Sequence, residues 1–317
     1  MMDIHDFSSS AYRLKQSWIG DFIMVIKMNY NFIAFVLSIV VVLVFCVVEL
    51  AIPPSINVEA TNVEEQIELP VVMYHHLSTS SNRLGDYVIS PKQLEDDLKY
   101  IQKCGYETIS AKQLIDFNEK GTPLPEKPIM ITFDDGNESV HEYAFPLLQQ
   151  YEMKAILSVI GKHTDIFSKE NEVSNINYSH VKWSQLKEMQ ESGIFEIGNH
   201  TYDMHDNPGG KRYGVLKKQS ESEEAYRQAL IDDIGGLSDQ IEREVGVRPF
   251  IFAYPFGKFS KETKPVIEEM GYKVIFTCEE KVNKLKPDMQ QPLSLKRFNR
   301  ASRYSTEGYF KRLGLEE

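Results

Sequence analysis

Two adjacent carboxylates stand directly after an apolar segment of the chain. Residues 129–133 are mostly apolar and run straight into Asp134, Asp135 and Gly136. Burying even one unpaired carboxylate costs several kcal/mol, so a strand that ends in two of them indicates a bound metal or a catalytic proton. The alternative is an ordinary turn, because Asp-Asp-Gly is also a common turn sequence.

Two histidines follow a second short apolar strand, in the run from Glu196 to His205. His200 and His205 are five residues apart, which is about 500° of helical rotation, so a helix would point their rings apart and a loop is expected instead. One carboxylate with two imidazoles is a ligand set of catalytic zinc, which leaves a position open for water. Both segments end strands of an alternating β/α chain, where such folds keep their active sites.

These segments carry a family resemblance. Thr-Phe-Asp-Asp-Gly at residues 132–136, with His-Thr at 200–201 and His205, resembles the first two motifs of NodB-type polysaccharide deacetylases, carbohydrate esterase family four. The resemblance covers roughly residues 69–313. The spacing of the two histidines is one residue longer than usual in that family. The longer spacing resembles the subgroup that deacetylates poly-N-acetylglucosamine, a biofilm exopolysaccharide.

The resemblance implies a role for each residue of the two motifs. Asp134 is expected to be the catalytic base, and the expected ligands of a divalent metal, zinc in the first place, are Asp135, His200 and His205. Bound zinc would lower the pKa of its water to about 7, and Asp134 would take the proton as that water attacks an acetyl carbonyl. The implied fold is α/β, a distorted (β/α) barrel with fewer than eight strands.

The expected general acid comes from early in the chain. Members with the common arrangement carry an acid histidine late in the sequence, but no histidine follows His205 here. The strand expected at residues 69–74 leads into His75 and His76, which resembles the circularly permuted deacetylases whose first strand carries this histidine. By that match His75 is the general acid. His76 is the alternative, or else a neighbour that contacts substrate or hydrogen-bonds a loop.

Residues 252–257, Phe-Ala-Tyr-Pro-Phe-Gly, resemble the family's third motif with two departures. Ala253 stands where the family has an Arg that steadies the base, and Phe256 stands where Tyr is usual. A backbone N–H does not need the phenol, so Phe256 can still donate to an oxyanion, and Tyr254 is expected to contact substrate. Arg297 is the expected replacement for the missing Arg. A solvated basic patch is the alternative interpretation of its surroundings.

Composition limits the classes of partner. The chain has 317 residues, is 42% hydrophobic and can bury one large core. Its net charge of −11 argues against nucleic acid, whereas a neutral or partly cationic glycan meets no such repulsion. Cys104 and Cys278 lack the spacing of a zinc site, and whether they pair is left open. The sequence indicates no protein partner.

The N-terminal part contains a candidate membrane anchor. Residues 32–50 are almost entirely apolar and long enough to span a ~30 Å hydrocarbon layer. Lys and Arg precede this segment, whereas Glu follows it with no Lys or Arg until Arg83. The positive-inside rule therefore predicts that residues 1–31 are cytoplasmic and that the rest lies outside the cell membrane. The alternative is a cleaved signal peptide and secretion, with Met28 as the true start.

A linker is expected at residues 51–68 and one catalytic domain at 69–317. Apolar periodicity in this domain predicts alternating helices and strands. The expected helices are 91–104, 140–151, 183–192, 221–245 and 261–270, the expected strands are 69–74, 129–133, 155–160, 250–253 and 274–277, and 161–178 is expected to be a surface loop.

The expected function is metal-dependent N-deacetylation of an N-acetylglucosamine polymer outside the cell, with poly-N-acetylglucosamine as the first candidate. Peptidoglycan or chitin oligomers are the alternative substrates. A non-catalytic glycan-binding relative would be expected to lack the base or the acid, and both Asp134 and His75 are present.

Overall fold

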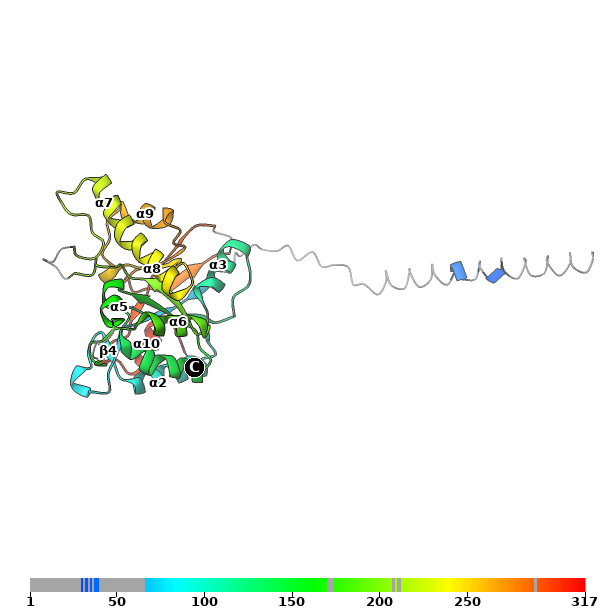
Figure 1. The fold of residues 1–317 in the computed structure, drawn as a ribbon. Helices are drawn as coiled ribbons and strands as arrows, with labels where there is room; N and C mark the ends of the chain where they lie inside the picture. Colours follow the sequence, from blue (N-terminus) through cyan, green and yellow to red (C-terminus); the bar gives the residue numbers. More distant parts are fainter. Residues whose placement is uncertain are drawn as a thin grey trace, which may run out of the picture. The chain divides into compact units, whose positions relative to one another are not determined.

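The computed structural model describes residues 66–169, 174–206, 209, 212–287 and 290–316, and in the N-terminal part residues 30, 32–33, 35 and 37–39. The chain divides into two units, residues 1–63 and 64–317. Figure 1 shows the ribbon, with helices packed around a twisted central sheet in the second unit.

In the first unit, the described residues are helical and exposed. No helix within the described part of the chain is long and apolar enough to cross a membrane. Most of the predicted anchor, residues 32–50, lies outside the described residues, as do nearly all of the predicted tail at 1–31 and most of the predicted linker at 51–68.

The second unit is built on a parallel sheet of nine strands. The strands run in the order β12-β10-β9-β8-β7-β6-β2-β13, and β5 pairs with β6 beside this path. Their bounds are β2 (Val71–Tyr74), β5 (Glu107–Thr108), β6 (Pro128–Phe133), β7 (Ala155–Val159), β8 (Phe195–Asn199), β9 (Ile251–Ala253), β10 (Val274–Phe276), β12 (Leu293–Leu295) and β13 (Phe298–Asn299). No described residue pairs β12 with β13, so the sheet forms an open half-barrel.

The parallel β/α architecture agrees with the prediction, but the number of strands does not. Nine strands in the described sheet exceed the expected fewer than eight. The extra strands are short: β5 and β13 have two residues each and β12 has three, too few for an apolar pattern to show. Two further pairs lie outside this sheet, the antiparallel β1 (Ile67–Leu69) with β11 (Asn283–Leu285) and the parallel β3 (His76–Leu77) with β4 (Val88–Ile89).

Helices alternate with the strands along the chain. Their bounds are α2 (Pro91–Lys103), α3 (Ala111–Lys120), α4 (Phe145–Gln150), α5 (Gly161–Phe167), α6 (Trp183–Glu191), α7 (Glu223–Leu230), α8 (Gly236–Val245), α9 (Thr263–Glu269) and α10 (Thr306–Arg312). Ser90 and Ser110 begin α2 and α3 with capping boxes. The predicted surface loop at 161–178 is wrong in its first part, because α5 is a short helix whose seven residues carry several polar side chains.

Two π-helical turns interrupt longer helices. Turn η2 (Val140–Ala144) precedes α4, and turn η3 (Ile231–Gly235) joins α7 to α8. The single long helix predicted at 221–245 is therefore continuous but carries an irregular turn in its middle. Such turns often occur at functional sites in proteins.

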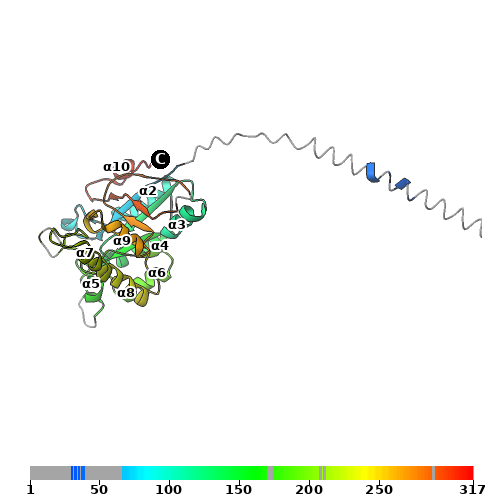
Figure 2. The ribbon, with the colours of Figure 1, turned by 90° about the horizontal axis from the view of Figure 1, so that it is seen from above.

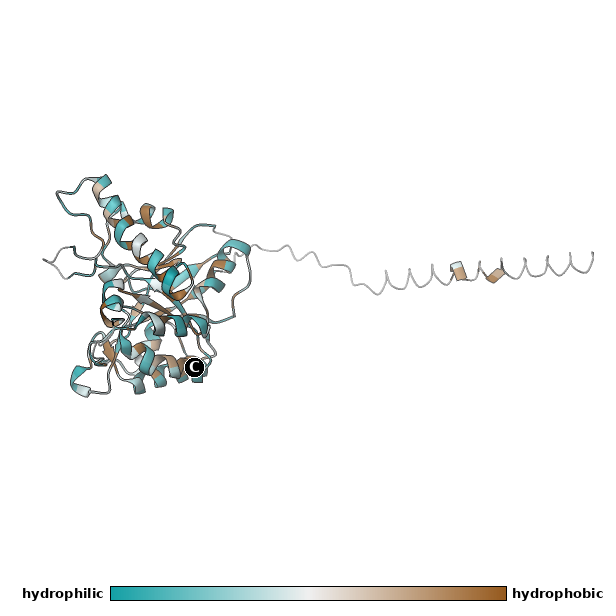
Figure 3. Cartoon of the chain, viewed as in Figure 1, coloured by the Kyte–Doolittle hydropathy of each residue, from teal (hydrophilic) through white to brown (hydrophobic). Residues whose placement is uncertain are grey.

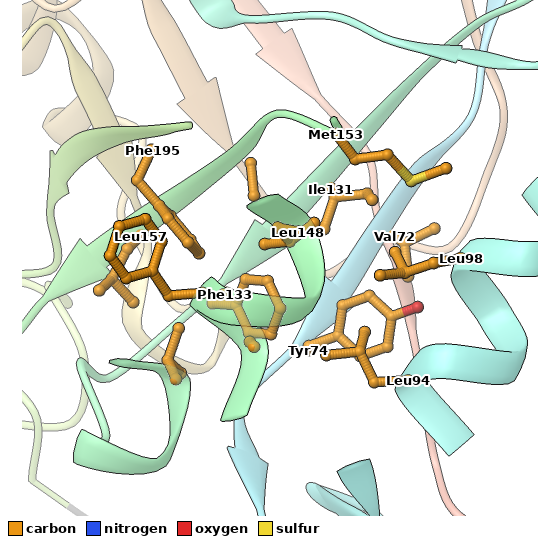
Figure 4. Close-up of a cluster of buried hydrophobic side chains, with 14 of the residues drawn as sticks. Val72, Tyr74, Leu94, Leu98, Ile131, Phe133, Leu148, Met153, Leu157 and Phe195 are labelled. Atoms are coloured by element: carbon orange, nitrogen blue, oxygen red, sulfur yellow. The ribbon is translucent and has the colours of Figure 1, made fainter. Parts of the chain in front are cut away.

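The core lies on both faces of the sheet. Every residue of β2, β6 and β7 is buried, as expected for parallel strands covered by helices. In Figure 4, Tyr74 lies next to Leu94 of α2 and Phe133 lies on the other side of Tyr74, and the two rings stack with their centroids 5.1 Å apart. Figure 2 shows α10 beside α2, where Phe310 stacks on Tyr100. The outer faces of the helices are mostly hydrophilic (Figure 3).

Candidate metal and acid–base site

The two adjacent aspartates lie in a turn that directs them to different partners. Asp134 continues β6, and its N–H donates to the carbonyl of Tyr74 at 3.0 Å. Asp135 and Gly136 then have φ angles of 72° and 76°, in the left-handed region. A side chain at position 136 would lie 3.1 Å from Val159 Cγ1, so glycine is needed there.

Arg297 binds Asp134 through a bidentate ion pair. Its two terminal nitrogens donate to Oδ1 at 2.8 Å and to Oδ2 at 2.7 Å, and both side chains are buried. Burial would raise the pKa of Asp134, but the charge and hydrogen bonds of Arg297, together with the nearby His200 and His75, outweigh burial and hold this pKa below its usual value. The predicted contact between Arg297 and Asp134 is therefore present. A solvated surface patch is excluded for Arg297, whose side chain is 0% exposed.

Asp135 instead faces the two histidines. Its Oδ1 lies 3.5 Å from His200 Nε2 and 3.3 Å from His205 Nε2. One ligand atom from each of the three residues lies within 4.8 Å of the others. Burial would raise the pKa of Asp135, but the neighbouring histidines, His200 and His205 first, hold it well below its usual value. Three converging donors of mixed N and O type fit a transition ion such as zinc.

The loop between the histidines replaces a helix, as the spacing predicted. The N–H of His200 donates to the Val159 carbonyl at 3.0 Å, which extends the pairing of β8 with β7. His200 Nδ1 lies 2.8 Å from the carbonyl oxygen of Ala253 and donates to it, so Nε2 keeps its lone pair for a metal. The ring of His205 packs 4.3 Å from that of Phe256.

A cavity of about 550 Å³ opens beside these groups at the carboxyl ends of the central strands. Its lining combines the aspartates and the two histidines with aromatic side chains. The lining residues are Met73, His75, Tyr87, Asp134, Asp135, His200, His205, Tyr213, Phe256, Cys278 and Asn299. Crevices at this edge of parallel sheets are where such folds bind ligands.

His75 lies in this cavity directly after β2. Its ring meets that of Tyr87 edge-on at 4.9 Å, and its Nδ1 is buried without a hydrogen-bond partner in the described part of the chain. Burial lowers the pKa of His75, and the nearby Asp135 and Asp134 oppose this effect only in part. The imidazole is therefore a stronger acid when protonated than an ordinary histidine.

Two predicted substrate contacts are not brought to the cavity. The Nδ1 of His76 lies 2.9 Å from Ser139 Oγ, and Tyr254 is buried with its ring stacked on Phe259 at 4.3 Å. Neither is among the residues that line the cavity. Successive side chains of an extended segment point to opposite sides, so His75 facing the cavity turns His76 away.

The structure adds lining residues that the sequence did not indicate. Tyr87 and Tyr213 come from loops and Asn299 ends β13, and all three lie outside the motifs. A single aromatic in a polar loop gives no recognisable pattern, so these residues carried no signal. Cys278 also lines the cavity, and in the described part of the chain no disulfide joins it to Cys104, which answers the open question of their pairing.

Comparison with known proteins places these motifs in a family. Residues 121–275 match the polysaccharide deacetylase family model. That segment contains Asp134, Asp135, His200 and His205 but not His75 or Arg297. The chain is 27% identical over 203 residues to a poly-beta-1,6-N-acetyl-D-glucosamine N-deacetylase of Staphylococcus aureus strain MRSA252, covering 64% of this chain and 65% of the relative.

Another relative and two solved structures extend the comparison. A protein of the same name from Escherichia coli K12 is 24% identical over 225 residues, which is 66% of this chain but only 33% of that protein. IcaB from Ammonifex degensii superposes with a TM-score of 0.60 at 27% identity, over 73% of this chain and 90% of that one. A de-N-acetylase from Aggregatibacter actinomycetemcomitans has a TM-score of 0.66 at 23% identity, over 78% and 100%, and shares the fold.

Proposed function

The chain belongs to the polysaccharide deacetylases, and from this premise we propose that it hydrolyses N-acetyl groups on an N-acetylglucosamine polymer, releasing acetate and a free amine. The observation that carries the proposal is the pairing of a buried, Arg-bound Asp134 with three converging metal ligands in one cavity. A purely glycan-binding protein needs neither an oriented base nor a metal site beside it.

Asp135, His200 and His205 would hold the metal. When bound, a divalent ion supplies an activated water and polarises the acetyl carbonyl. Asp134 accepts the proton of the attacking water, and the two Arg297 hydrogen bonds keep this carboxylate ionised and fixed in orientation. The backbone N–H of Phe256 is the proposed further donor to the oxyanion.

His75 supplies the proton that the leaving amine needs, because an amine leaves poorly unless it is protonated. It lies in the same cavity as the base but follows a different strand, β2, which suits a separate acid. Burial lowers the pKa of His75 below its ordinary value of 6.5, so the protonated form is abundant only at pH values below that. We therefore propose that turnover is favoured on the acidic side of neutrality.

The substrate proposed first is poly-β-1,6-N-acetylglucosamine. The long spacing between His200 and His205 and the early acid His75 support this choice, as does the name of the staphylococcal relative. Two aromatic rings at the cavity also suit a sugar, because the apolar face of a pyranose packs well on an aromatic ring. The side chain of Tyr87 is 61% exposed and that of Phe256 is 36% exposed. Peptidoglycan and chitin oligomers remain the alternative substrates.

The location of the enzyme is a further part of the proposal. We propose that residues 32–50 anchor the chain in the cell membrane with residues 69–317 outside. The apolar length of the segment and the charge difference across it support this arrangement. The apolar side chains described there, among them Phe32, Ile33 and Phe35, are exposed, which suits contact with lipid.

An assay of the purified full-length chain tests the activity. Acetate release is measured from poly-β-1,6-N-acetylglucosamine, peptidoglycan and chitin oligomers, with zinc added and after exhaustive chelation. We expect the first polymer to react fastest and chelation to abolish the reaction until metal is restored. Full activity after chelation would contradict a metal-dependent mechanism, and preference for another polymer would change the substrate but not the reaction.

A further inference from the structure

The turn between the two metal-binding histidines holds a residue in an unfavourable conformation. Thr201 follows His200 directly and has a φ angle of 71°. A β-branched side chain is rarely found in the left-handed region, because its Cβ substituents crowd the backbone. Such a conformation persists only where the surrounding structure enforces it. Neighbouring groups must therefore hold this turn in its conformation.

One carboxylate accepts hydrogen bonds from the next two backbone amides. The N–H of Tyr202 donates to Asp233 Oδ1 at 2.7 Å, and the N–H of Asp203 donates to Asp233 Oδ2 at 2.8 Å. The strained residue itself donates from its N–H to Asn199 Oδ1 at 2.8 Å. Hydrogen bonds to an ionised carboxylate are stronger than those between neutral groups. Three successive amides of the turn are thus bound to side chains.

Asp233 belongs to η3, the π-helical turn between α7 and α8. The helix is fixed in the core through Leu230, Ile234 and Leu237, which are fully buried. Asp232, one residue earlier, is exposed and accepts a hydrogen bond from Gln228 on the same helix. A π-turn changes the direction in which the side chains after it point, and here it accompanies a carboxylate that reaches the loop.

The same helix also holds the strand end before the turn. Asn199 Nδ2 donates to the Ile234 carbonyl at 2.9 Å and to the Tyr272 hydroxyl at 2.8 Å. Asn199 thus binds η3 through its amide nitrogen and Thr201 through its amide oxygen. Both ends of the turn are therefore attached to one rigid element that carries no metal ligand itself.

We propose that Asp233 is a positioning residue for the metal site. It holds the turn from Thr201 to Asp203 in its strained form, and this form places His205 Nε2 3.3 Å from Asp135 Oδ1. The proposal rests on the proposed function only in requiring that the chain binds a metal. It concerns a residue outside the aspartate and histidine motifs, whose hydrogen bonds come from the backbone of the turn and not from any of the three proposed metal ligands.

Zinc affinity tests the proposal in the full-length chain. Zinc is titrated in competition with a chromophoric chelator at a temperature where circular dichroism shows every variant folded. We expect Asp233→Ala to weaken zinc binding roughly 10-fold to 100-fold, the range typical of groups that orient metal ligands. Asp233→Asn should lose less, because its amide oxygen still accepts one of the two bonds. The matched control Asp232→Ala should bind zinc like the wild type.

A second substitution separates positioning from general stability. Asn adopts the left-handed conformation far more readily than Thr, so Thr201→Asn in the Asp233→Ala background should recover much of the lost affinity. Recovery would support relief of strain as the reason that the carboxylate is needed. Thr201→Asn alone is the baseline, because it also removes the Oγ1 that accepts from the Met204 N–H at 3.3 Å. If Asp233→Ala weakens zinc binding as much in the Thr201→Asn background as in the wild type, relief of strain is overturned as the reason.

The outcomes distinguish this inference from the proposed function. If the wild type binds zinc and Asp233→Ala binds it equally well, the positioning role is wrong and the proposed function stands. If the wild type binds no zinc, the proposed function itself fails. Should Asp233→Ala not fold, Asp233→Asn decides the question, and an affinity equal to that of Asp232→Ala would overturn the role.

Discussion

Asp134 and Asp135 are adjacent in sequence but have opposite surroundings. Asp134 is enclosed with the permanent cation Arg297, whereas Asp135 faces two imidazoles at the cavity. The positive φ of Asp135 makes this separation possible, because a regular strand end would not direct the second carboxylate to the loop of His200 and His205. These different partners suit Asp134 to the proposed role of accepting a proton and Asp135 to the proposed role of binding a metal.

Substituting each aspartate separately tests these roles. Asp134→Asn should abolish turnover while zinc stays bound, because an amide cannot accept the proton but leaves the three ligands intact. Asp135→Asn should weaken zinc binding itself, since only a carboxylate neutralises the cation. Metal content and acetate release are measured on the same preparations. Equal metal loss in both variants would mean that the roles are wrongly assigned.

The proposed acid role of His75 predicts a pH effect with a definite sign. Burial lowers the pKa of His75 below its ordinary value of 6.5, so the protonated acid is lost as pH rises through that lowered pKa. The rate should therefore fall on the alkaline side. His75→Ala should reduce the rate on the order of 10²–10⁴ and remove this alkaline limb, with zinc retained.

His76→Ala is the matched control for that experiment, because His76 is adjacent in sequence but faces Ser139 and not the cavity. Its effect on rate should be mild. An activated aryl ester, whose leaving group needs little protonation, should be spared much of the His75→Ala loss. If His76→Ala were the more damaging substitution, the acid would be His76. If neither mattered, the acid would come from elsewhere.

The residues of the two motifs could be predicted from the sequence because the members of each motif lie close together in the chain. The turn at Asp134 and Asp135 and the His200–His205 loop each lie within a few consecutive residues, so strand ends can be read directly. The sequence left two interpretations of Arg297, a partner of Asp134 or part of a solvated basic patch. The two residues are 163 positions apart, so no local pattern links them. Tyr254 was predicted to contact substrate because it lies in a recognisable motif, but its side chain packs into the core.

At the scale of elements, a second histidine pair lies between α5 and the segment before α6. His163 Nδ1 and His180 Nε2 are 3.1 Å apart. The backbone of His180 also forms an isolated antiparallel β-bridge with Asn137, in the turn after the aspartates. Burial, and then the neighbouring His163, lower the pKa of His180 to about 4. Two protonated imidazoles this close would repel each other, so the folded protein keeps His180 neutral.

This depressed pKa predicts a loss of stability in acid. Between pH 6.5 and about 4 the unfolded chain binds a proton at His180 that the folded chain does not, so the free energy of unfolding falls as pH falls. Above pH 6.5 both states are neutral there, and the effect vanishes. His180→Gln should reduce the loss between pH 7 and pH 5 by on the order of 1–2 kcal/mol.

Urea unfolding of the metal-free wild type and variant at the two pH values measures this effect. Chelation is needed so that release of metal from the site does not contribute. An identical loss of stability in the two proteins would contradict the assignment of His180 as a neutral histidine.

Sequence analysis recovered α2 and α6 from the periodic spacing of their apolar residues. It missed α3 and α10 and took α5 for a loop, because short amphipathic helices with polar residues resemble surface loops. The π-turn η3 could not be predicted either. It is enforced by tertiary contacts, and no local pattern distinguishes it from the α-helices on each side.

At the scale of the whole molecule, the proposed anchor predicts a topology. In intact cells, added protease should digest the part after residue 50, while the tail at 1–31 should be protected. The full-length chain should remain in the membrane fraction after washing with high salt, because apolar insertion does not depend on ionic strength. A mature protein in the medium that begins after residue 50 would instead support a cleaved signal peptide.

The sheet order has a consequence for how the protein is made. β2 lies between β6 and β13, so the first strand of this sheet pairs with its last, Phe298 beside Val72. Arg297 precedes that last strand, and until it arrives Asp134 has no cationic partner. Long-range pairings of this kind form late because closing a large loop costs entropy. A growing chain on the ribosome would therefore carry an incomplete site until the residues around Arg297 had emerged, so synthesis itself delays the assembly of the Asp134–Arg297 pair.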